Sequence, residues 1–194
     1  MSRILRLTLA LGLIVALALV AAACGDDDDD GDDTGGEITL TGVETTLSLD
    51  STLAALLERN DVTVEPIAPA SASDDGITFP ITGGTIDSET LVGTIEHAGG
   101  LRFSAGGEEV AVTDFVIDTT NDTLTATADG DQLRLLAVNL DDFARSSDGD
   151  IILLEGVTTT LVPEAAVILN RTFGVVLFEE GIEVGDVTIR ASAA

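Results

Sequence analysis

The sequence predicts a mainly β fold, an antiparallel and sandwich-like domain of about ten strands with two short helices, over residues 37–194. Three observations predict this class. Short runs rich in Thr, Val and Ile alternate apolar with polar residues, as half-buried strands do. Gly, Asp and Asn separate the runs, and these residues suit tight turns. The runs also follow one another too closely for the long crossovers that a parallel sheet needs.

The first predicted helix covers residues 50–60. Asp50 or Ser51 can cap its first turn, because both side chains accept hydrogen bonds from backbone N–H groups. Three leucines share one face at helical spacing: Leu53, Leu56 and Leu57. The predicted strands around this helix are 38–40, 43–49 and 62–67.

The centre of the chain is predicted to be a β meander. A loop over 66–76 precedes a strand whose face carries Ile77, Phe79 and Ile81, and Gly83-Gly84 is expected to turn the chain. A hairpin around Gly99-Gly100 is expected next. The predicted strands of this region are 91–97, 101–104, 108–119, 123–128 and 132–140, followed by a polar loop over 141–150.

The end of the domain repeats its beginning. Val-Glu-Thr-Thr-Leu at 43–47 precedes the first helix, and Val-Thr-Thr-Thr-Leu at 157–161 precedes a second predicted helix over 163–172. Pro163 suits a first helical turn, and Gly174 is well placed to end the helix. Two strand–helix–strand units therefore bracket the meander. The remaining predicted strands are 151–161, 175–178 and 182–191.

The N-terminus has the three parts of an export signal. Arg3 and Arg6 form a positive region, residues 7–20 form an apolar stretch, and Ala21 to Ala23 lead into Cys24. This pattern resembles the lipobox of bacterial lipoproteins. The resemblance implies that residues 1–23 are a signal peptide and that Cys24 is lipidated. An ordinary signal peptide or a single membrane anchor is the alternative, although the apolar run is short for a membrane span.

Residues 24–36 are predicted to be a disordered tether. After Cys24 they contain seven aspartates, four glycines and no apolar residue, and such a segment cannot bury a core. With the lipid on Cys24, the tether implies an exported protein anchored to the outer face of the cytoplasmic membrane or the cell surface. The membrane is then a partner through the lipid anchor.

Charge excludes one class of partner. The chain carries 35 acidic against 8 basic residues, a net charge of −27 at pH 7. Electrostatic binding to DNA or RNA is therefore not expected.

The sequence does not contain a catalytic set. The only histidine lacks a serine elbow beside it, and Cys24 is the only cysteine. A zinc site needs several His or Cys ligands, and a phosphate loop needs a Lys that this chain lacks. Paired carboxylates all flank predicted turns: Asp74-Asp75, Asp129/Asp131, Asp141-Asp142 and Asp148/Asp150. We therefore expect a protein that is not an enzyme and has no metal site, with a carboxylate-based hydrolase as the unfavoured alternative.

His97 is the one candidate for ligand binding. It lies in phase with Leu91 and Ile95, so that its side chain is predicted to point toward an apolar face. A structural histidine near a strand end is one interpretation, and a ligand or metal contact is the other.

The stretch from Gly93 to Leu101, the β run to Thr119 and Leu124-Thr125-Ala126 resemble the core of Htaa-type domains. These are secreted or cell-surface domains of actinobacteria that act in haem capture. The resemblance covers about residues 77–140 and extends to Leu169-Asn170. It implies β-strands with two short helices, and it places His97 near the family's conserved histidine. The family's iron ligand is a tyrosine, and this chain has none.

Two functions follow as expectations. The first is a non-catalytic, Htaa-like surface lipoprotein domain that binds a ligand or a cell-envelope partner, without a cofactor. The alternative is haem or iron capture through His97.

Overall fold

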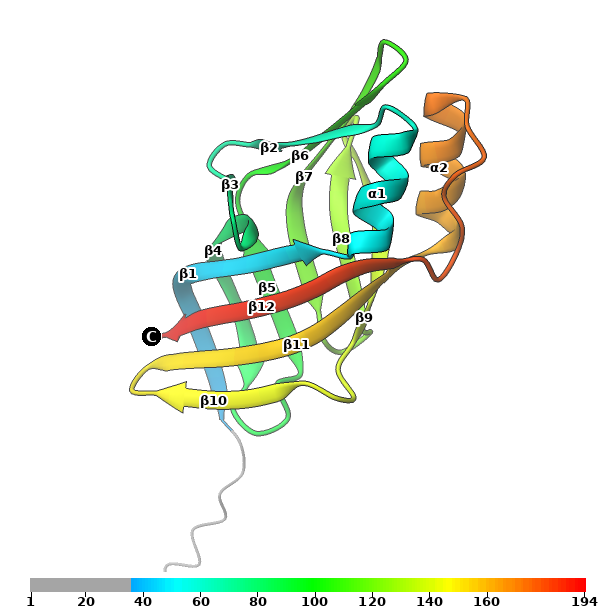
Figure 1. Ribbon diagram of the computed structural model, residues 1–194. Coiled ribbons are helices and arrows are strands. Elements are labelled where there is room, and N and C mark those ends of the chain that lie inside the picture. Colours follow the sequence, from blue (N-terminus) through cyan, green and yellow to red (C-terminus); the bar gives the residue numbers. More distant parts are fainter. Residues whose placement is uncertain (1–35) are drawn as a thin grey trace, which may run out of the picture. The chain divides into compact units, whose positions relative to one another are not determined.

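The computed structural model describes residues 36–194 (Figure 1). The predicted signal peptide, Cys24 and the predicted tether up to residue 35 lie outside the described residues. Within the described part, no helix is long and apolar enough to cross a membrane. The helices are α1 (Ser51–Arg59) and α2 (Pro163–Phe173). The strands are β1 (Glu37–Leu49), β2 (Thr63–Ile67), β3 (Ser71–Ser73), β4 (Gly76–Asp87), β5 (Gly93–His97), β6 (Gly100–Ala105), β7 (Glu108–Asp118), β8 (Thr123–Ala128), β9 (Asp131–Asn139), β10 (Ala144–Asp148), β11 (Ile151–Leu161) and β12 (Glu183–Ala193).

Eight of the strands form a closed sheet. Their order is β7-β5-β4-β1-β12-β11-β9-β8, and β8 pairs back with β7. Every pairing is antiparallel. The prediction of a mainly β, antiparallel domain with two short helices is confirmed. One continuous wall encloses the interior, where a sandwich would use two layers.

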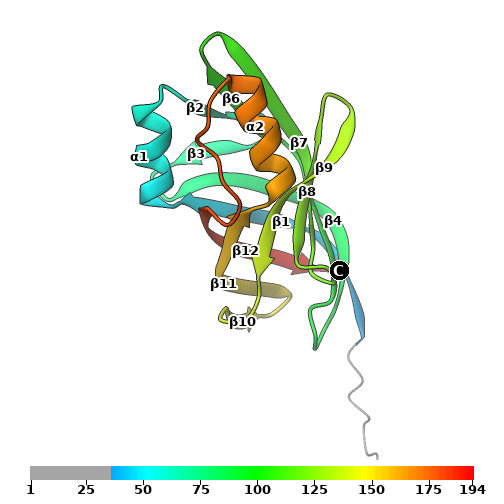
Figure 2. The same ribbon diagram turned by 90° about the vertical axis from the view of Figure 1, so that its right-hand side faces the viewer.

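The remaining strands extend this wall. β6 continues along β7 and carries β2 on its other side, β3 pairs with β4, and β10 pairs with β11. Figures 1 and 2 show α1 and α2 on the same side of the closed sheet.

Both helices begin and end as their sequences predict. The side chain of Asp50 accepts hydrogen bonds from the backbone N–H groups of Thr52 and Leu53, and these bonds lower the pKa of its carboxyl group. At the other helix, Gly174 adopts a left-handed conformation with φ 64° and ends α2. Each helix is anchored by its buried apolar residues, Leu53 and Leu57 in α1 and Ala165 and Ala166 in α2. Burial of each leucine contributes about 1.5–3 kcal/mol.

The repeated sequence corresponds to a structural repeat. β1 and β11 lie on the two sides of β12, and each leads into a helix. Thr45 and Thr159 hold the same position in the two copies, and both are buried, at 5% and 1% exposure. The repeat therefore places two threonines on the inner face of the sheet.

The expected turn at Gly83-Gly84 is wrong, because β4 runs through both residues to Asp87. Gly84 has φ 125°, and a Cβ there would collide with the carbonyl group of Thr94 on β5. This glycine therefore serves the close approach of β4 and β5. The chain turns later, where Asp87 accepts hydrogen bonds from the backbone of Glu89 and Thr90.

The expected hairpin around Gly99-Gly100 is also wrong. β5 and β6 do not pair with each other. Instead they lie one after the other along the same side of β7, from Thr94 opposite Asp118 to Ala105 opposite Glu108. Gly99 lies between the two strands with φ 89°. The position requires glycine, because a Cβ there would collide with Ala70. The hairpin turn lies beyond it, at Gly106-Gly107.

Three smaller expectations are corrected. The predicted loop 66–76 contains β3, and the predicted loop 141–150 contains β10. Both strands are exposed along their whole length, so they lack the alternation that marks a half-buried strand. The predicted strand 175–178 is an irregular segment, and the side chain of Asn170 makes hydrogen bonds to its Leu177 and Phe178.

Candidate functional site

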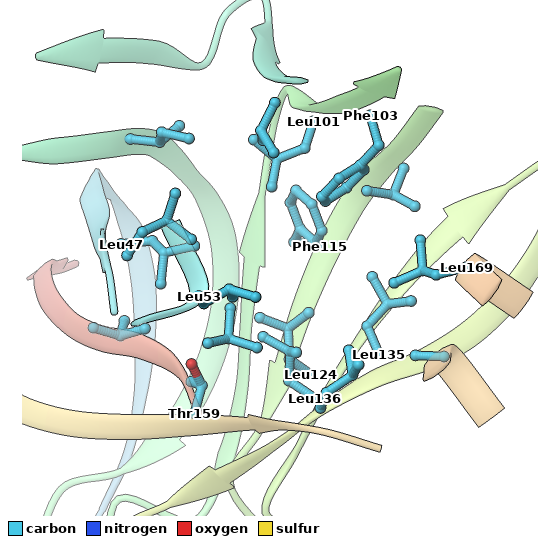
Figure 3. Close-up of a pocket in the computed structure, with 18 of the residues that line it drawn as sticks. Leu47, Leu53, Leu101, Phe103, Phe115, Leu124, Leu135, Leu136, Thr159 and Leu169 are labelled. Carbon is cyan, nitrogen blue, oxygen red and sulfur yellow. The ribbon is translucent and has the colours of Figure 1, made fainter. Parts of the chain in front are cut away.

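A cavity of about 130 Å³ lies inside the closed sheet, beneath the two helices. Leu53 and Leu57 of α1 and Leu169 of α2 line it, together with inward-facing residues of the strands (Figure 3). Almost all of its lining residues are aliphatic or Phe. The exceptions are Thr45, His97 and Thr159, and none of the described residues that line the cavity is charged.

The walls of this cavity present carbon atoms only, because no polar atom of the lining residues is open to it. The aromatic part of the wall includes Phe79 and Phe115, whose rings meet edge to face with centroids 5.0 Å apart. Such pairs stabilise a packed core by about 0.5–1.5 kcal/mol beyond the area they bury. The sheet therefore holds an apolar chamber with an aromatic part in its wall.

His97 lies in the wall of this chamber at the end of β5, with 5% of its surface exposed. Its Nδ1 is 3.1 Å from the backbone oxygen of Phe115, and its Nε2 is 2.7 Å from the hydroxyl of Thr45. A carbonyl oxygen only accepts, so Nδ1 carries the proton and donates to Phe115. Nε2 is then the acceptor, and the hydroxyl of Thr45 donates to it.

Burial lowers the pKa of His97 to about 4, while the hydrogen bond to Phe115 acts in the opposite direction. The imidazole is therefore neutral at physiological pH, as the tautomer deduced from its two hydrogen bonds requires. Both ring nitrogens are engaged within the protein, and neither points to the cavity as a free ligand atom.

Thr159 holds the matching position on β11, the other strand of the repeat, but its partner is a backbone group. Its hydroxyl donates to the backbone oxygen of Gly185 at 2.9 Å. Sequence reasoning missed Thr45 and Thr159 as pocket residues. The signal that could have found them was the repeat itself, since the same threonine stands in both copies.

The carboxylates that the sequence offers for catalysis lie elsewhere. All eight residues of the four acidic pairs are exposed at turns, and none lines the cavity. Among the described residues, no three His, Cys, Asp or Glu side chains gather to hold a metal ion. Cys24 lies outside the described residues.

Part of the chamber wall comes from the irregular segment 174–182, which follows α2. Phe178 and Ile182 of this segment line the cavity. Asn170 of α2 holds the segment: its side chain donates to the oxygen of Phe178 at 2.7 Å and accepts from the N–H groups of Leu177 and Phe178 at 2.8 and 3.0 Å. The segment and α2 are thus joined at the chamber wall.

No protein-family model matches the chain, and no curated protein sequence matches it. Solved structures do match the fold. The C-terminal domain of HtaA from Corynebacterium glutamicum aligns with a TM-score of 0.61 at 13% identity, over 81% of this chain and 99% of that one. The N-terminal domain of the same HtaA aligns with a TM-score of 0.57 at 16% identity, over 83% and 99% of the two chains.

A third solved structure, of HtaB from Corynebacterium glutamicum, is described as a heme binding protein. It aligns with a TM-score of 0.51 at 11% identity, over 82% of this chain and 96% of that one. The three comparisons show that this chain has an HtaA- and HtaB-like fold.

Proposed function

We propose that this protein is a non-catalytic binding protein that captures a hydrophobic ligand in the chamber beneath α1 and α2. The observation that carries the proposal is the carbon-only wall of a cavity of about 130 Å³. Ligand sites are concave and mostly apolar, and their few polar groups serve specificity more than catalysis. The lining offers no nucleophile, acid or base with a free polar atom.

Porphyrins are the ligand class to consider first. The fold is shared with HtaB, which is described as heme binding, and with two domains of HtaA. A porphyrin presents a broad hydrocarbon surface, which suits a chamber lined by Leu, Val, Ile and Phe. The shared fold supports porphyrins as the class of ligand, and the apolar lining supports hydrophobic contacts with them.

Haem held through its iron does not fit the residues as they are arranged. Protein ligands to haem iron are His, Cys, Met or Tyr. His97 is the one such residue in the cavity wall, and both its nitrogens are hydrogen-bonded. Among residues 36–194, no cationic side chain lines the cavity to pair with the propionates of haem. The proposal therefore rests on contacts with the macrocycle and assigns no ligand to the iron.

The size of the cavity adds a condition. Sites for drug-sized ligands have volumes of about 300–1,000 Å³, whereas this cavity measures about 130 Å³. A porphyrin can enter only partly unless α1 and α2 move apart. We therefore expect binding to depend on the packing of the helices on the sheet.

Two titrations of the purified protein test the proposal. Haemin binding is followed by its Soret band, and binding of metal-free protoporphyrin IX is followed by its fluorescence. We expect both to bind saturably with similar affinity, because the contacts are with the macrocycle. If neither binds, the porphyrin proposal is wrong.

Haem capture through His97 is the alternative outcome of these titrations, and it requires His97 to give up its hydrogen bond to Thr45 or to Phe115. If haem is captured through His97, haemin is expected to bind and protoporphyrin IX is not, and His97→Gln is expected to abolish the Soret shift. Thr46→Val is the control for a folded variant, because Thr46 lies on β1 beside Thr45 but does not line the cavity.

We further propose that the domain is exported and held at the cell surface by a lipid on Cys24. Support comes from the lipobox-like sequence and from the acidic segment that follows it. Radioactive palmitate is expected to label the wild-type protein and not Cys24→Ala. Labelling of that variant would refute lipidation at Cys24.

A further inference from the structure

The chamber differs from most ligand sites in having no polar atom open to it. Ordinary pockets combine an apolar lining with a few placed polar groups. Here the polar atoms of Thr45, His97 and Thr159 are turned toward one another or toward the backbone, and their carbon atoms form the wall. The hydrogen bonds of these side chains are thus satisfied inside the protein.

Such a chamber excludes both water and ionised groups. A buried water needs two to four polar partners, and the wall offers none. An ionised group would lose its hydration without gaining a counter-charge, because no charged residue of the described part of the chain lines the cavity. The size of the chamber is close to that of an engineered apolar cavity of about 150 Å³ that stays dry and binds benzene.

From this wall we infer that the chamber accepts a hydrocarbon group without any hydrogen-bonding function, either a small ring or an alkyl side chain of a larger molecule. The polar and ionised groups of that molecule stay outside the chamber. The inference rests on the proposed function for the identity of the whole ligand, but the hydrocarbon site is defined by the cavity alone. For a porphyrin, it assigns the alkyl-bearing edge to the inside and the propionates to the solvent.

Two small probes of similar shape, toluene and phenol, test the chamber directly. Each is titrated into the purified protein by calorimetry, and the shift of the thermal unfolding midpoint is measured in parallel. Toluene is expected to bind saturably. Phenol is expected to bind roughly 5- to 100-fold more weakly, because its hydroxyl is buried without a partner. Equal or tighter binding of phenol overturns the inference.

Filling the chamber locates the bound probe. Ala128 on β8 lines the cavity. Ala128→Leu is expected to weaken toluene binding at least tenfold, because the larger side chain occupies space that the probe needs. Ala128→Val is the milder variant, for use if the larger side chain prevents folding. Ala55→Leu is the matched control, because Ala55 is exposed on α1 and does not line the cavity. Unchanged toluene binding in both Ala128 variants places the probe elsewhere and refutes the site.

A pair of porphyrins extends the test to the whole ligand. Mesoporphyrin IX carries ethyl groups where haematoporphyrin IX carries hydroxyethyl groups, so the two differ in the polarity of one edge. Mesoporphyrin is expected to bind roughly 5-fold or more tightly, and equal binding contradicts the assigned orientation. If toluene binds and no porphyrin does, the hydrocarbon site stands and the porphyrin proposal fails. If porphyrins bind and phenol equals toluene, the proposed function stands and this inference fails.

Discussion

The hydroxyl of Thr45 lies 2.7 Å from Nε2 of His97 and connects β1 to β5 across the intervening β4. The same imidazole reaches β7 through its Nδ1, which is 3.1 Å from the oxygen of Phe115. One side chain thus links three strands from inside the closed sheet. Because both bonds are buried, losing either one leaves a polar group without water or a protein partner.

Removing the hydroxyl of Thr45 is expected to destabilise the fold. Thr45→Val keeps the shape of the side chain but leaves Nε2 of His97 without a donor, at a cost of about 1–3 kcal/mol. Thr45→Ser restores the hydroxyl and is expected to recover part of this loss. Urea unfolding measures the three proteins. Thr46→Val, on the outer face of the same strand, loses only a partly buried hydrogen bond to the hydroxyl of Thr78 and is expected to cost about 0.5 kcal/mol.

Acid is expected to destabilise the protein through His97. Its pKa is about 4 in the folded state, against 6.5 for an exposed imidazole. Between these values the unfolded chain binds a proton that the folded chain does not, so stability falls as the pH drops from about 6.5 to 4. The integrated loss is on the order of 3 kcal/mol. His97→Gln removes this contribution, and the difference between the two pH profiles of unfolding measures it. Parallel profiles over this range would contradict the buried neutral imidazole.

Asn170 is expected to hold the segment after α2 in place. Asn170→Ala removes three hydrogen bonds to Leu177 and Phe178 and is expected to cost about 2 kcal/mol. Hydrogen exchange at the amides of these two residues should accelerate. Asn170→Asp keeps the acceptor for both amides and loses only the donor to the oxygen of Phe178, so amide protection should fall less than in Asn170→Ala. Protection that is unchanged in Asn170→Ala would show that other contacts hold the segment.

Gly83 and Gly84 offer a matched pair on β4. Gly84→Ala is expected to cost about 3 kcal/mol or more, because its Cβ collides with the carbonyl of Thr94 and its φ of 125° is strained for alanine. Gly83→Ala meets only a carboxylate oxygen of Glu96 at 3.6 Å and is expected to lie within about 0.5 kcal/mol of wild type. The thermal unfolding midpoints of the two variants measure this difference. Equal midpoints would contradict a close approach of the backbone at Gly84.

Much of the local structure could be predicted from the sequence. The first helix follows from the capping Asp50 and its leucine face, and the second from Pro163 and Gly174, because caps and helical periodicity act within a few residues. Strands with one buried face follow from alternation. Strands without such a face, such as β10, could not be found in this way.

The site was less predictable. The phase of His97 predicts that it points to an apolar face, and it does so. Its hydrogen-bond partner Thr45 is 52 residues away in the chain, and no local pattern connects the two. The glycines at 83–84 and 99–100 predict turns from the sequence, because turns and close backbone approaches both favour glycine.

The sequence by itself determined the β class, the two helices and their ends, and the repeat that contains Thr45 and Thr159. Only the tertiary structure decided that the sheet closes through β7 and β8, that β5 and β6 form one line along β7, and that a carbon-walled chamber lies inside. The physical reason is the distance along the chain between the interacting residues. Capping and alternation depend on neighbours along the chain, whereas closure and cavity shape depend on contacts between strands far apart in sequence.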